Sequence, residues 1–150
     1  MLKNYSFKTH INPNYQTIYE LKPLFIELFN DWDEDWLMGT FERHQLVHLI
    51  MAKDMSRNIV GFKLGYGVSY KTFYSWLGGV SAGHRQKGVA GKMIEIQQSW
   101  AKESNFKKIT TKSMNKFREM MILNLKSGFV INGTELDESG RVKVLFEKEI

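Results

Sequence analysis

Hydrophobic and polar residues alternate in some segments of the chain, as in strands, and recur at helical spacing in others. Each change between these two patterns marks a new predicted element. They alternate over Ser6 to Ile11, which favours a first strand, whereas apolar residues recur at helical spacing over Tyr15 to Phe29, which predicts one helix. Asp33 has the residue type of an N-cap and precedes a segment that reads as a short helix towards Arg43. The first third of the chain is therefore predicted as a strand followed by two helices.

The middle of the chain carries the signals of strands. Two apolar runs, Leu46 to Ala52 and Ile59 to Tyr66, are separated by a polar, turn-like stretch, so they predict a β-hairpin. Gly65 and Gly67 weaken the strand signal at the end of the second run. Thr72 to Ser81 is rich in aromatic and β-branched residues, and we expect it to form the central strand.

The last third returns to helical spacing twice. Helices are predicted from Gly88 to about Ser104 and from Lys116 to Lys126, and Gly128 is placed to end the second one. The apolar side of that second helix is expected at Phe117, Met120, Met121 and Leu125. Further strands are expected at Lys108 to Lys112 and, as a terminal hairpin, at Phe129 to Leu136 and Val142 to Glu147.

Composition indicates one soluble, folded domain, residues 1–150. The chain is 43% hydrophobic and 25% charged, which is typical of a folded protein and not of a disordered one. No apolar stretch approaches the roughly 20 residues that a membrane-spanning helix needs. Met1 to His10 lacks the apolar segment of a secretory signal, so we expect a cytoplasmic location.

Two kinds of chemistry are disfavoured by the residues that are present. The chain has no cysteine, so disulfides, thiolate metal sites and a cysteine nucleophile are excluded. His44, His48 and His84 do not have the spacing of a metal site, and no metal is expected.

The formal net charge of +5 at pH 7 favours an anionic partner. A nucleic acid, a membrane surface and a phosphorylated cofactor would each satisfy it, so a basic nucleic-acid-binding module is an alternative function. Lysine and arginine are spread along the whole chain, and no helix-turn-helix, zinc-finger or RNA-recognition pattern is present. The sequence gives this alternative little support, and we expect no nucleic-acid partner.

The segment His84 to Lys92, between the predicted central strand and a helix, has the composition of an anion-binding loop. Its small residues are Gly88, Ala90 and Gly91, and its cations are Arg85 and Lys87. Small residues let backbone N–H groups approach an anion, and the following helix adds its own free N–H groups and dipole. A pyrophosphate would fit there. The loop has neither the phosphate-loop pattern nor the dinucleotide-binding pattern.

The pattern Arg85-x-x-Gly88-x-Ala90 resembles the signature [QR]-x-x-G-x-[GA] of the Gcn5-related N-acetyltransferase (GNAT) family. Three other segments are similar to elements of that family. Leu77-Gly78-Gly79-Val80 matches the fourth strand, Ile109 to Met114 followed by Asn115 matches the fifth, and Leu123 to Phe129 matches the closing L-Y-x-K-x-G-F element. The resemblance runs from about Ile59 to the last residue. It agrees with the strand, loop, helix, strand order that the periodicity predicts.

This resemblance implies an α/β (α+β) fold with a mixed central sheet of about seven strands and about four helices. It also implies an acyltransferase that moves an acetyl group from acetyl-CoA to a primary amine by direct attack, without a covalent enzyme intermediate. The pantetheine arm would contact Gly79, Val80, Ser81 and Asn115. The pyrophosphate would be held by Arg85, Gln86, Lys87, Gly88, Val89 and Ala90.

The sequence departs from the family at the positions of the acid and the base. Asn124 replaces the tyrosine that often serves as the acid, and the predicted central strand contains no carboxylate. Tyr74, Ser75 and Asn124 are therefore the candidate catalytic residues. A water could relay the proton through Tyr74, Ser75, Glu34 or Glu42. An acyl-CoA-binding protein without catalysis is the second alternative function.

The acceptor is open among small amines, amino acids, antibiotics, peptide N-termini and lysines. The family builds its acceptor site from the region that corresponds to Asp31 to Trp36, where acids and aromatic rings would attract a cationic amine. Glu34, Trp36 and Glu42 are the expected acceptor contacts. The same acids are also typical of a solvated helix N-terminus. Exposed terminal strands of such a sheet commonly pair between subunits, so a homodimer is expected.

Overall fold

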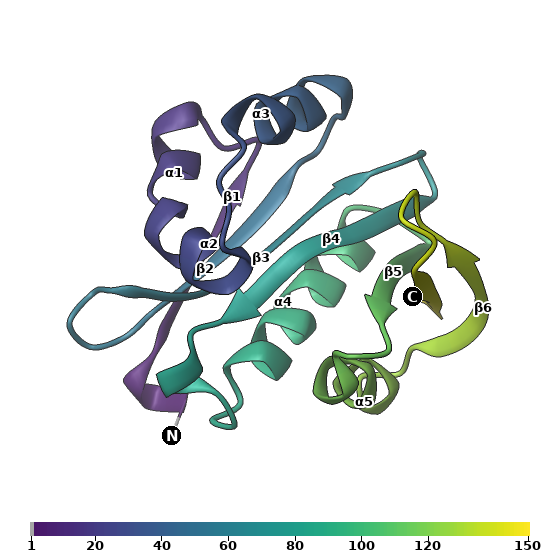
Figure 1. Cartoon of the computed structure of the whole chain (residues 1–150). Helices are drawn as coiled ribbons and strands as arrows, with labels where there is room; N and C mark the ends of the chain where they lie inside the picture. Colours follow the sequence, from purple (N-terminus) through teal and green to yellow (C-terminus); the bar gives the residue numbers. More distant parts are fainter. Residues whose placement is uncertain (1) are drawn as a thin grey trace.

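In the structure, a computed structural model that describes residues 2–150, seven strands form one mixed sheet (Figure 1). The strands are β1 (Ser6–Ile11), β2 (His48–Lys53), β3 (Ile59–Gly67), β4 (Thr72–Val80), β5 (Lys108–Met114), β6 (Val130–Leu136) and β7 (Val142–Glu149). Their order in the sheet is β1-β2-β3-β4-β5-β7-β6, so β4 is the middle strand, as its composition predicts. All neighbours are antiparallel except β4 and β5, which are parallel.

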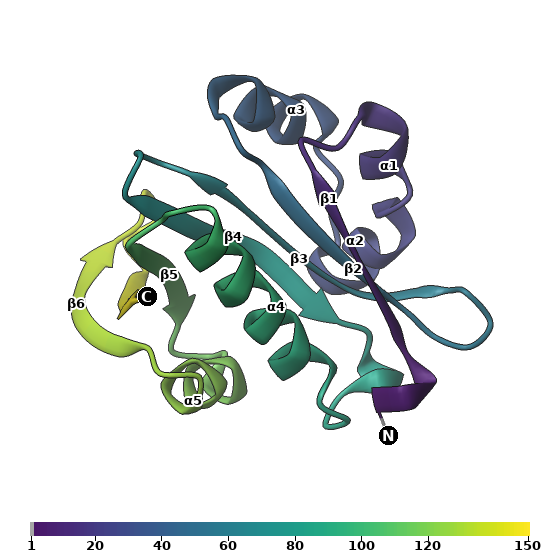
Figure 2. The ribbon, with the colours of Figure 1, turned by 180° about the vertical axis from the view of Figure 1, so that it is seen from behind.

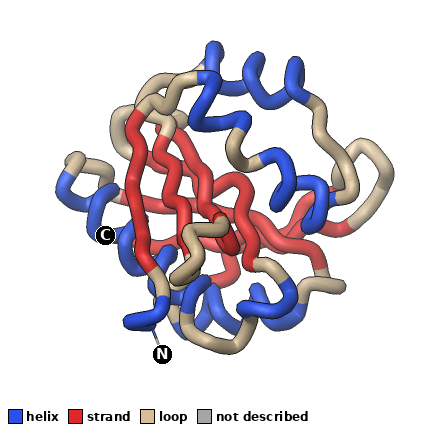
Figure 3. Tube along the Cα trace, turned by 90° about the vertical axis from the view of Figure 1, so that its left-hand side faces the viewer, coloured by secondary structure: helices blue, strands red, loops and turns tan. Residues whose placement is uncertain are grey.

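Helices cover both faces of this sheet. They are α1 (Tyr15–Tyr19), α2 (Lys22–Phe29), α3 (Glu34–Arg43), α4 (Val89–Glu103) and α5 (Arg118–Lys126), with short 3-10 turns at Leu2–Asn4 and Ala82–His84. Figure 2 shows α1, α2 and α3 on one face and α4 and α5 on the other, and Figure 3 shows helices on both sides of the strands. Within residues 2–150, no helix is both long and apolar enough to cross a membrane.

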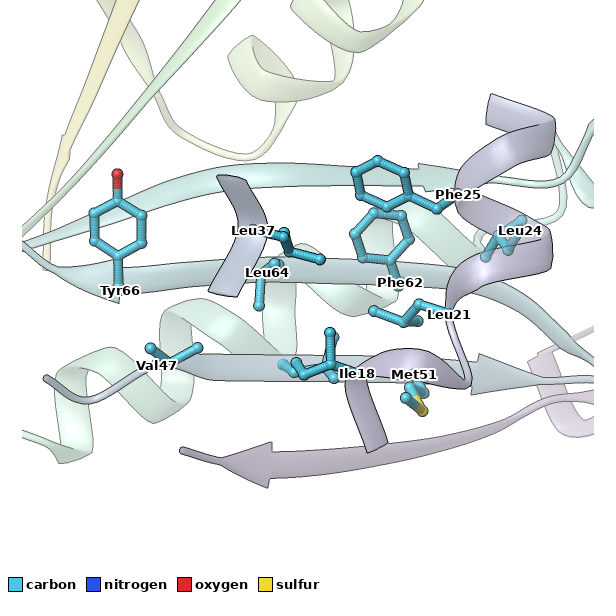
Figure 4. Packing of buried hydrophobic residues seen from close by; sticks show 11 residues of the cluster. Ile18, Leu21, Leu24, Phe25, Leu37, Val47, Met51, Phe62, Leu64 and Tyr66 are labelled. Carbon is cyan, nitrogen blue, oxygen red and sulfur yellow. The ribbon is translucent and has the colours of Figure 1, made fainter. Parts of the chain in front are cut away.

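Side chains of β3 alternate between the two faces of the sheet, and each face is part of a different hydrophobic core. Phe62 and Leu64 are fully buried against α1, α2 and α3, in the cluster that Figure 4 shows. Gly61, one position away, faces α4, because a Cβ placed there would lie 3.3 Å from Met93. Residues at odd and even positions of β3 therefore serve opposite faces of the sheet.

The helix predicted over residues 15–29 is wrong as a single helix, because the chain forms α1 and α2 instead. Pro23, in the first turn of α2, has no N–H to donate to the carbonyl of Tyr19, so the first helix ends before it. Leu21 and Phe25 stay in the core, with 0% and 5% of their surface exposed. The hydrophobic spacing thus identified the core residues but not the break between α1 and α2, and residues 2–150 contain five α-helices.

The apolar side predicted for α5 is also corrected. Phe117 and Leu125 are 49% and 47% exposed, whereas Asn124 is the fully buried residue of this helix. Met121 and Leu123 pack against the core beside it. Apolar residues occur almost all round α5, so periodicity could not select its buried face.

Both predicted helix boundaries with a clear local signal are confirmed. The Asp33 side chain accepts a hydrogen bond of 3.0 Å from the Trp36 N–H at the start of α3. After α5, Gly128 has φ +96°, and the Phe129 N–H donates to the Asn124 carbonyl at 3.0 Å. This is the glycine-ended Schellman arrangement, in which the left-handed residue satisfies the last carbonyls of the helix.

Candidate active site

The parallel strands β4 and β5 run together for only part of their length. They pair from Thr72–Lys108 to Ser75–Thr111, where the Thr111 hydroxyl donates to the Ser75 carbonyl at 2.8 Å. Beyond that point β4 pairs only with β3, and β5 only with β7. A gap therefore opens in the middle of the sheet, between the end of β4 and β5 (Figure 1).

A β-bulge explains where the gap begins. Opposite β3, the pairing moves from Gly65–Ser75 to Leu64–Leu77, so Trp76 is an extra residue in β4. Trp76 and Leu77 consequently both pack on the α1–α3 side of the sheet. An extra residue bends and twists its strand. In β4 the bend turns the second half of the strand away from β5.

Beyond Ser75, the backbone of β4 turns some of its groups towards this gap, where no strand pairs with them. The Ser81 N–H donates to the Val60 carbonyl of the neighbouring segment at 2.8 Å, so alternation also turns the backbone groups of Gly79 towards β3. Gly78 and Val80 then turn theirs towards the gap. Of the three residues expected to pair with pantetheine, Val80 faces the gap directly, and Gly78 is a further position that the sequence did not single out.

The loop after β4 ends in an open helix N-terminus. Gln86 and Gly88 have φ of 58° and 87°, and these two left-handed residues turn the chain into α4. Gly88 is the N-cap, no side chain caps the helix, and no acidic residue lies in its first turn. The first helical bond runs from the Lys92 N–H to the Gly88 carbonyl, so the N–H groups of residues 89–91 have no partner within the helix.

Neighbouring segments hold the start of this loop. The Glu27 carboxylate of α2 accepts hydrogen bonds from the Ser81 hydroxyl at 2.9 Å and from the Ala82 N–H at 3.3 Å. The Tyr5 hydroxyl lies 2.8 Å from Nδ1 of His84. The Arg85 guanidinium donates to the Val80 carbonyl at 2.9 Å, so this predicted phosphate ligand lies over the end of β4. These hydrogen bonds hold the first half of the loop, residues 80–85, against α2, Tyr5 and the end of β4.

Asn115 follows β5, on the opposite side of the gap from β4, and is exposed. Its expected contact with pantetheine stays a prediction.

The candidate catalytic residues of β4 lie on opposite faces of the sheet. Tyr74 packs with the α1–α3 cluster, whereas Phe73 packs with α4, so alternation places buried Ser75 on the α4 side. Burial, with smaller contributions from Tyr66 and Glu135, raises the pKa of Tyr74 to about 12. The phenol is therefore protonated at neutral pH. It can donate a proton to a leaving group but is a poor base.

A charged pair that the sequence did not single out lies beside Tyr74. Lys112 of β5 stands 5.8 Å from the centre of the Tyr74 ring and forms an ion pair of 2.6 Å with Glu135 of β6. The partners are far apart in sequence and lie on strands that are not adjacent, so no local pattern could have predicted the pair.

The three expected acceptor contacts on α3 do not converge on one point. Trp36 lies against Trp76 at the bulge, with ring centres 4.9 Å apart. The Glu34 carboxylate accepts a hydrogen bond of 2.5 Å from Tyr15, which raises the pKa of that phenol to about 12. Glu42 instead lines an open cleft of about 460 Å³ beside the end of α3. Only Trp36 is placed near the start of the gap.

Aromatic rings extend the surface around Trp76. Phe41 and Tyr66 have their ring centres 6.4 and 5.5 Å from that of Trp76, and Tyr66 lies 5.6 Å from Tyr74. The sequence identified Tyr74 and Trp36 but not the rings that join them, because these come from different elements. Within residues 2–150, no group of three or more His, Asp or Glu side chains could hold a metal ion, and the expectation of no metal stays a prediction.

Solved structures with a similar arrangement of elements include a GNAT family acetyltransferase. A GNAT family acetyltransferase from Elizabethkingia anophelis with acetyl-CoA bound matches with a TM-score of 0.71 and 16% identity, over 98% of this chain and 99% of that one. NAA60 from Arabidopsis thaliana in complex with a bisubstrate analogue matches with a TM-score of 0.77 and 14% identity, over 97% and 98%. The NatC complex bound to Gag peptide and CoA matches with a TM-score of 0.80 and 12% identity, over 98% and 99%.

Sequence comparison alone finds no relative. No family model matches the sequence, and no curated protein matches it either. The structural similarities nevertheless extend over almost the whole chain. They show that the chain has the GNAT fold, as the motif resemblance implied.

Proposed function

We propose, with the GNAT fold as the premise, that this protein transfers an acetyl group from acetyl-CoA to a primary amine. The observation that carries the proposal is the gap between β4 and β5, which ends at an uncapped helix N-terminus with cations beside it. A linear donor would match both features, with its polar arm along the gap and its pyrophosphate at the helix N-terminus. Several neighbours with this fold are acetyltransferases, and one of them has acetyl-CoA bound.

The donor would enter the sheet as a substitute strand. Its pantetheine amides would pair with the backbone of Gly78 and Val80, which face the gap. Its pyrophosphate would accept hydrogen bonds from the N–H groups of residues 86–90, beside Arg85 and Lys87. Arg85 would exchange its bond to the Val80 carbonyl for a phosphate oxygen.

The reaction would proceed by direct attack. The nitrogen of the neutral amine forms a bond to the thioester carbon, the C–S bond breaks, and CoA leaves as the thiolate. A β4 N–H in the gap would stabilise the oxyanion that develops. The amine gives its proton to water, and the thiolate takes up a proton from Tyr74 or solvent, because Glu34 and Glu42 lie away from the gap and Ser75 lies on the opposite face. Asn124, buried on α5, cannot act as an acid of comparable strength.

Calorimetric titration with acetyl-CoA, followed by assay of free CoA thiol with a panel of amines and peptides, tests this function. Saturable binding and thiol release that needs an amine would support it. Binding without release for any acceptor would favour the binding protein without catalysis. A folded protein that binds no acetyl-CoA would overturn the proposal and favour assays with nucleic acids.

We predict that Tyr74→Phe lowers turnover about tenfold and leaves the affinity for acetyl-CoA unchanged. This fall in turnover is smaller than the hundredfold or more that the loss of a general acid usually causes, because a thiolate leaves readily without a proton. Turnover should be measured across pH at saturating acetyl-CoA. The matched control is Tyr66→Phe, which removes a neighbouring hydroxyl from the same aromatic cluster. Unchanged turnover and pH profile in Tyr74→Phe would remove this residue from the mechanism.

The acceptor would approach from the α1–α3 side, where Trp36 and Trp76 meet the start of the gap. Among proteins with this fold, NatC is described with a bound Gag peptide, so peptide N-termini belong in the acceptor panel beside small amines.

A homodimer would use an edge of the sheet. Strand β6 is one such edge, and Val130, Ile131 and Leu136 are more than half exposed there. Light scattering after size-exclusion chromatography would determine the oligomeric state.

A further inference from the structure

Lys63 of β3 carries a positive charge on the α4 face of the sheet, beside the proposed donor site. It pairs with Gly78 of β4, and alternation from Gly61 puts its side chain on the face that α4 covers. There it lines a narrow cavity with Phe62, Gly78, Gly79, Ala90, Met93, Ile94 and Met120. This cavity lies under the half of β4 that borders the gap.

Gly78 lies directly beside the stem of the Lys63 side chain. A Cβ at Gly78 would stand 3.5 Å from Cγ of Lys63 and 2.9 Å from the Phe62 carbonyl oxygen, closer than a real Cβ can approach. The absence of a side chain at this position therefore lets β4 pass close to the Phe62 carbonyl, and the stem of Lys63 lies against the backbone of β4.

The Lys63 ammonium has no counter-charge. None of the four ion pairs formed within residues 2–150 includes it, and no carboxylate lines its cavity. On the elements packed around it, Lys92 and Glu95 of α4 pair with each other at 3.4 Å, and Arg118 and Glu119 lie in the first turn of α5. Lys63 as a whole is of intermediate exposure, but burial of its ammonium lowers the pKa of Lys63 to about 8.

The same cavity reaches the first turn of α4, through Ala90. The free N–H groups of a helix N-terminus carry partial positive charge, so a lysine nearby is repelled unless an anion lies between them. The free protein thus combines an unpaired cation, a positive helix end and two cations on the loop. An anion at this point would relieve all of these repulsions at once.

We propose that Lys63 is the third cation of the donor site and that its ammonium binds a pyrophosphate oxygen of acetyl-CoA. This inference rests on the proposed function. The cavity measures about 10 Å³, room for roughly one water, so the side chains of Lys63 and Met120 fill the space in the free protein. Both are unbranched and flexible, and they can turn aside when the donor enters.

The test compares wild type, Lys63→Met and Lys63→Arg by calorimetry at pH 7 and pH 9.5. Lys63→Met keeps the length of the side chain and removes its charge, and we expect it to bind acetyl-CoA about tenfold more weakly at pH 7. The wild type should lose about tenfold in affinity between the two pH values, because the free lysine deprotonates above about pH 8. Lys63→Met should bind equally at both, and Lys63→Arg should keep its affinity at pH 9.5.

Two further ligands locate the contact. S-acetylpantetheine, which lacks the pyrophosphate, should bind wild type and Lys63→Met equally, whereas inorganic pyrophosphate should bind wild type more tightly. Equal loss of S-acetylpantetheine would overturn the proposal, because the contact would then be with pantetheine. Lys63→Met should melt no lower than wild type, since it removes an unpaired buried charge. A lower melting temperature would mean that loss of structure explains the weaker binding.

The inference and the proposed function fail in different ways. Acetyl-CoA binding of equal strength in wild type and Lys63→Met overturns the inference and leaves the function. Binding of pyrophosphate that depends on Lys63, without binding of acetyl-CoA, supports the cation site and overturns the function. Binding of neither ligand overturns both.

Discussion

The variant Arg85→Ala, Lys87→Ala is expected to bind acetyl-CoA about a hundredfold or more weakly than wild type, because it loses two charge-assisted contacts to the pyrophosphate. Both side chains are exposed on the loop before α4, so their removal should leave the free energy of unfolding almost unchanged. Calorimetry with acetyl-CoA at fixed ionic strength measures the first effect, and chemical denaturation measures the second.

A control with the same change in net charge separates a specific contact from general attraction. Lys71→Ala, Lys107→Ala removes two exposed lysines at the other end of β4, where the chain enters β4 and β5. We expect acetyl-CoA to bind this control within about twofold of wild type in 0.15 M salt, since exposed charges more than a Debye length of about 8 Å away are largely screened. Equal losses in both variants would mean that the loop makes no specific contact. No loss in either would place the pyrophosphate elsewhere.

The protein is expected to lose about 3 kcal/mol of stability between about pH 6.5 and pH 4 through His48 alone. His48 is fully buried, its ring stacks on Trp100 at 4.2 Å, and neither ring nitrogen has a hydrogen-bond partner. Burial lowers the pKa of His48 to about 4. Between pH 6.5 and about pH 4, His48 is protonated in the unfolded chain but stays neutral in the folded protein. The free energy of unfolding therefore falls as the pH is lowered, and this contribution levels off below about pH 4.

The variant His48→Leu, which has no titrating ring, isolates this term. Urea denaturation at pH 7.5, 5.5 and 4.5 should show a flatter dependence on pH in His48→Leu than in wild type. The variant should also be at least as stable at pH 7.5, because the two unpaired ring nitrogens are gone. His44→Gln is the matched control, since it removes a histidine that bonds the Thr40 carbonyl and leaves His48 in place. An unchanged pH slope in His48→Leu would show that His48 becomes protonated in the folded protein.

The loop contacts and the His48 effect depend on residues at very different separations along the chain. The Arg85 and Lys87 contacts follow from a motif whose residues lie within six positions of one another. The His48 effect depends on Trp100 and Phe73, which come from other elements and surround the ring only after folding. In the sequence, His48 was notable only because it failed to form a metal pattern.

The sequence by itself determined the elements whose causes are local. Alternation placed β1 at Ser6–Ile11, composition placed β4 at the centre of the sheet, and Asp33 and Gly128 marked helix ends through bonds that span three to five residues. The prediction of an anion-binding loop was equally local, because small residues, cations and a helix start adjoin there. The one local signal that was missed is Pro23, which ends α1.

Only the tertiary structure decided the features that depend on which strands become neighbours. The bulge at Trp76 and the short pairing of β4 with β5 open the gap, and β7 lies between β5 and β6. The ion pair of Lys112 with Glu135 and the position of Lys63 over Gly78 follow from that arrangement. The physical reason is that strand register and packing join residues that are distant in the chain, and periodicity reports only the face on which each residue lies.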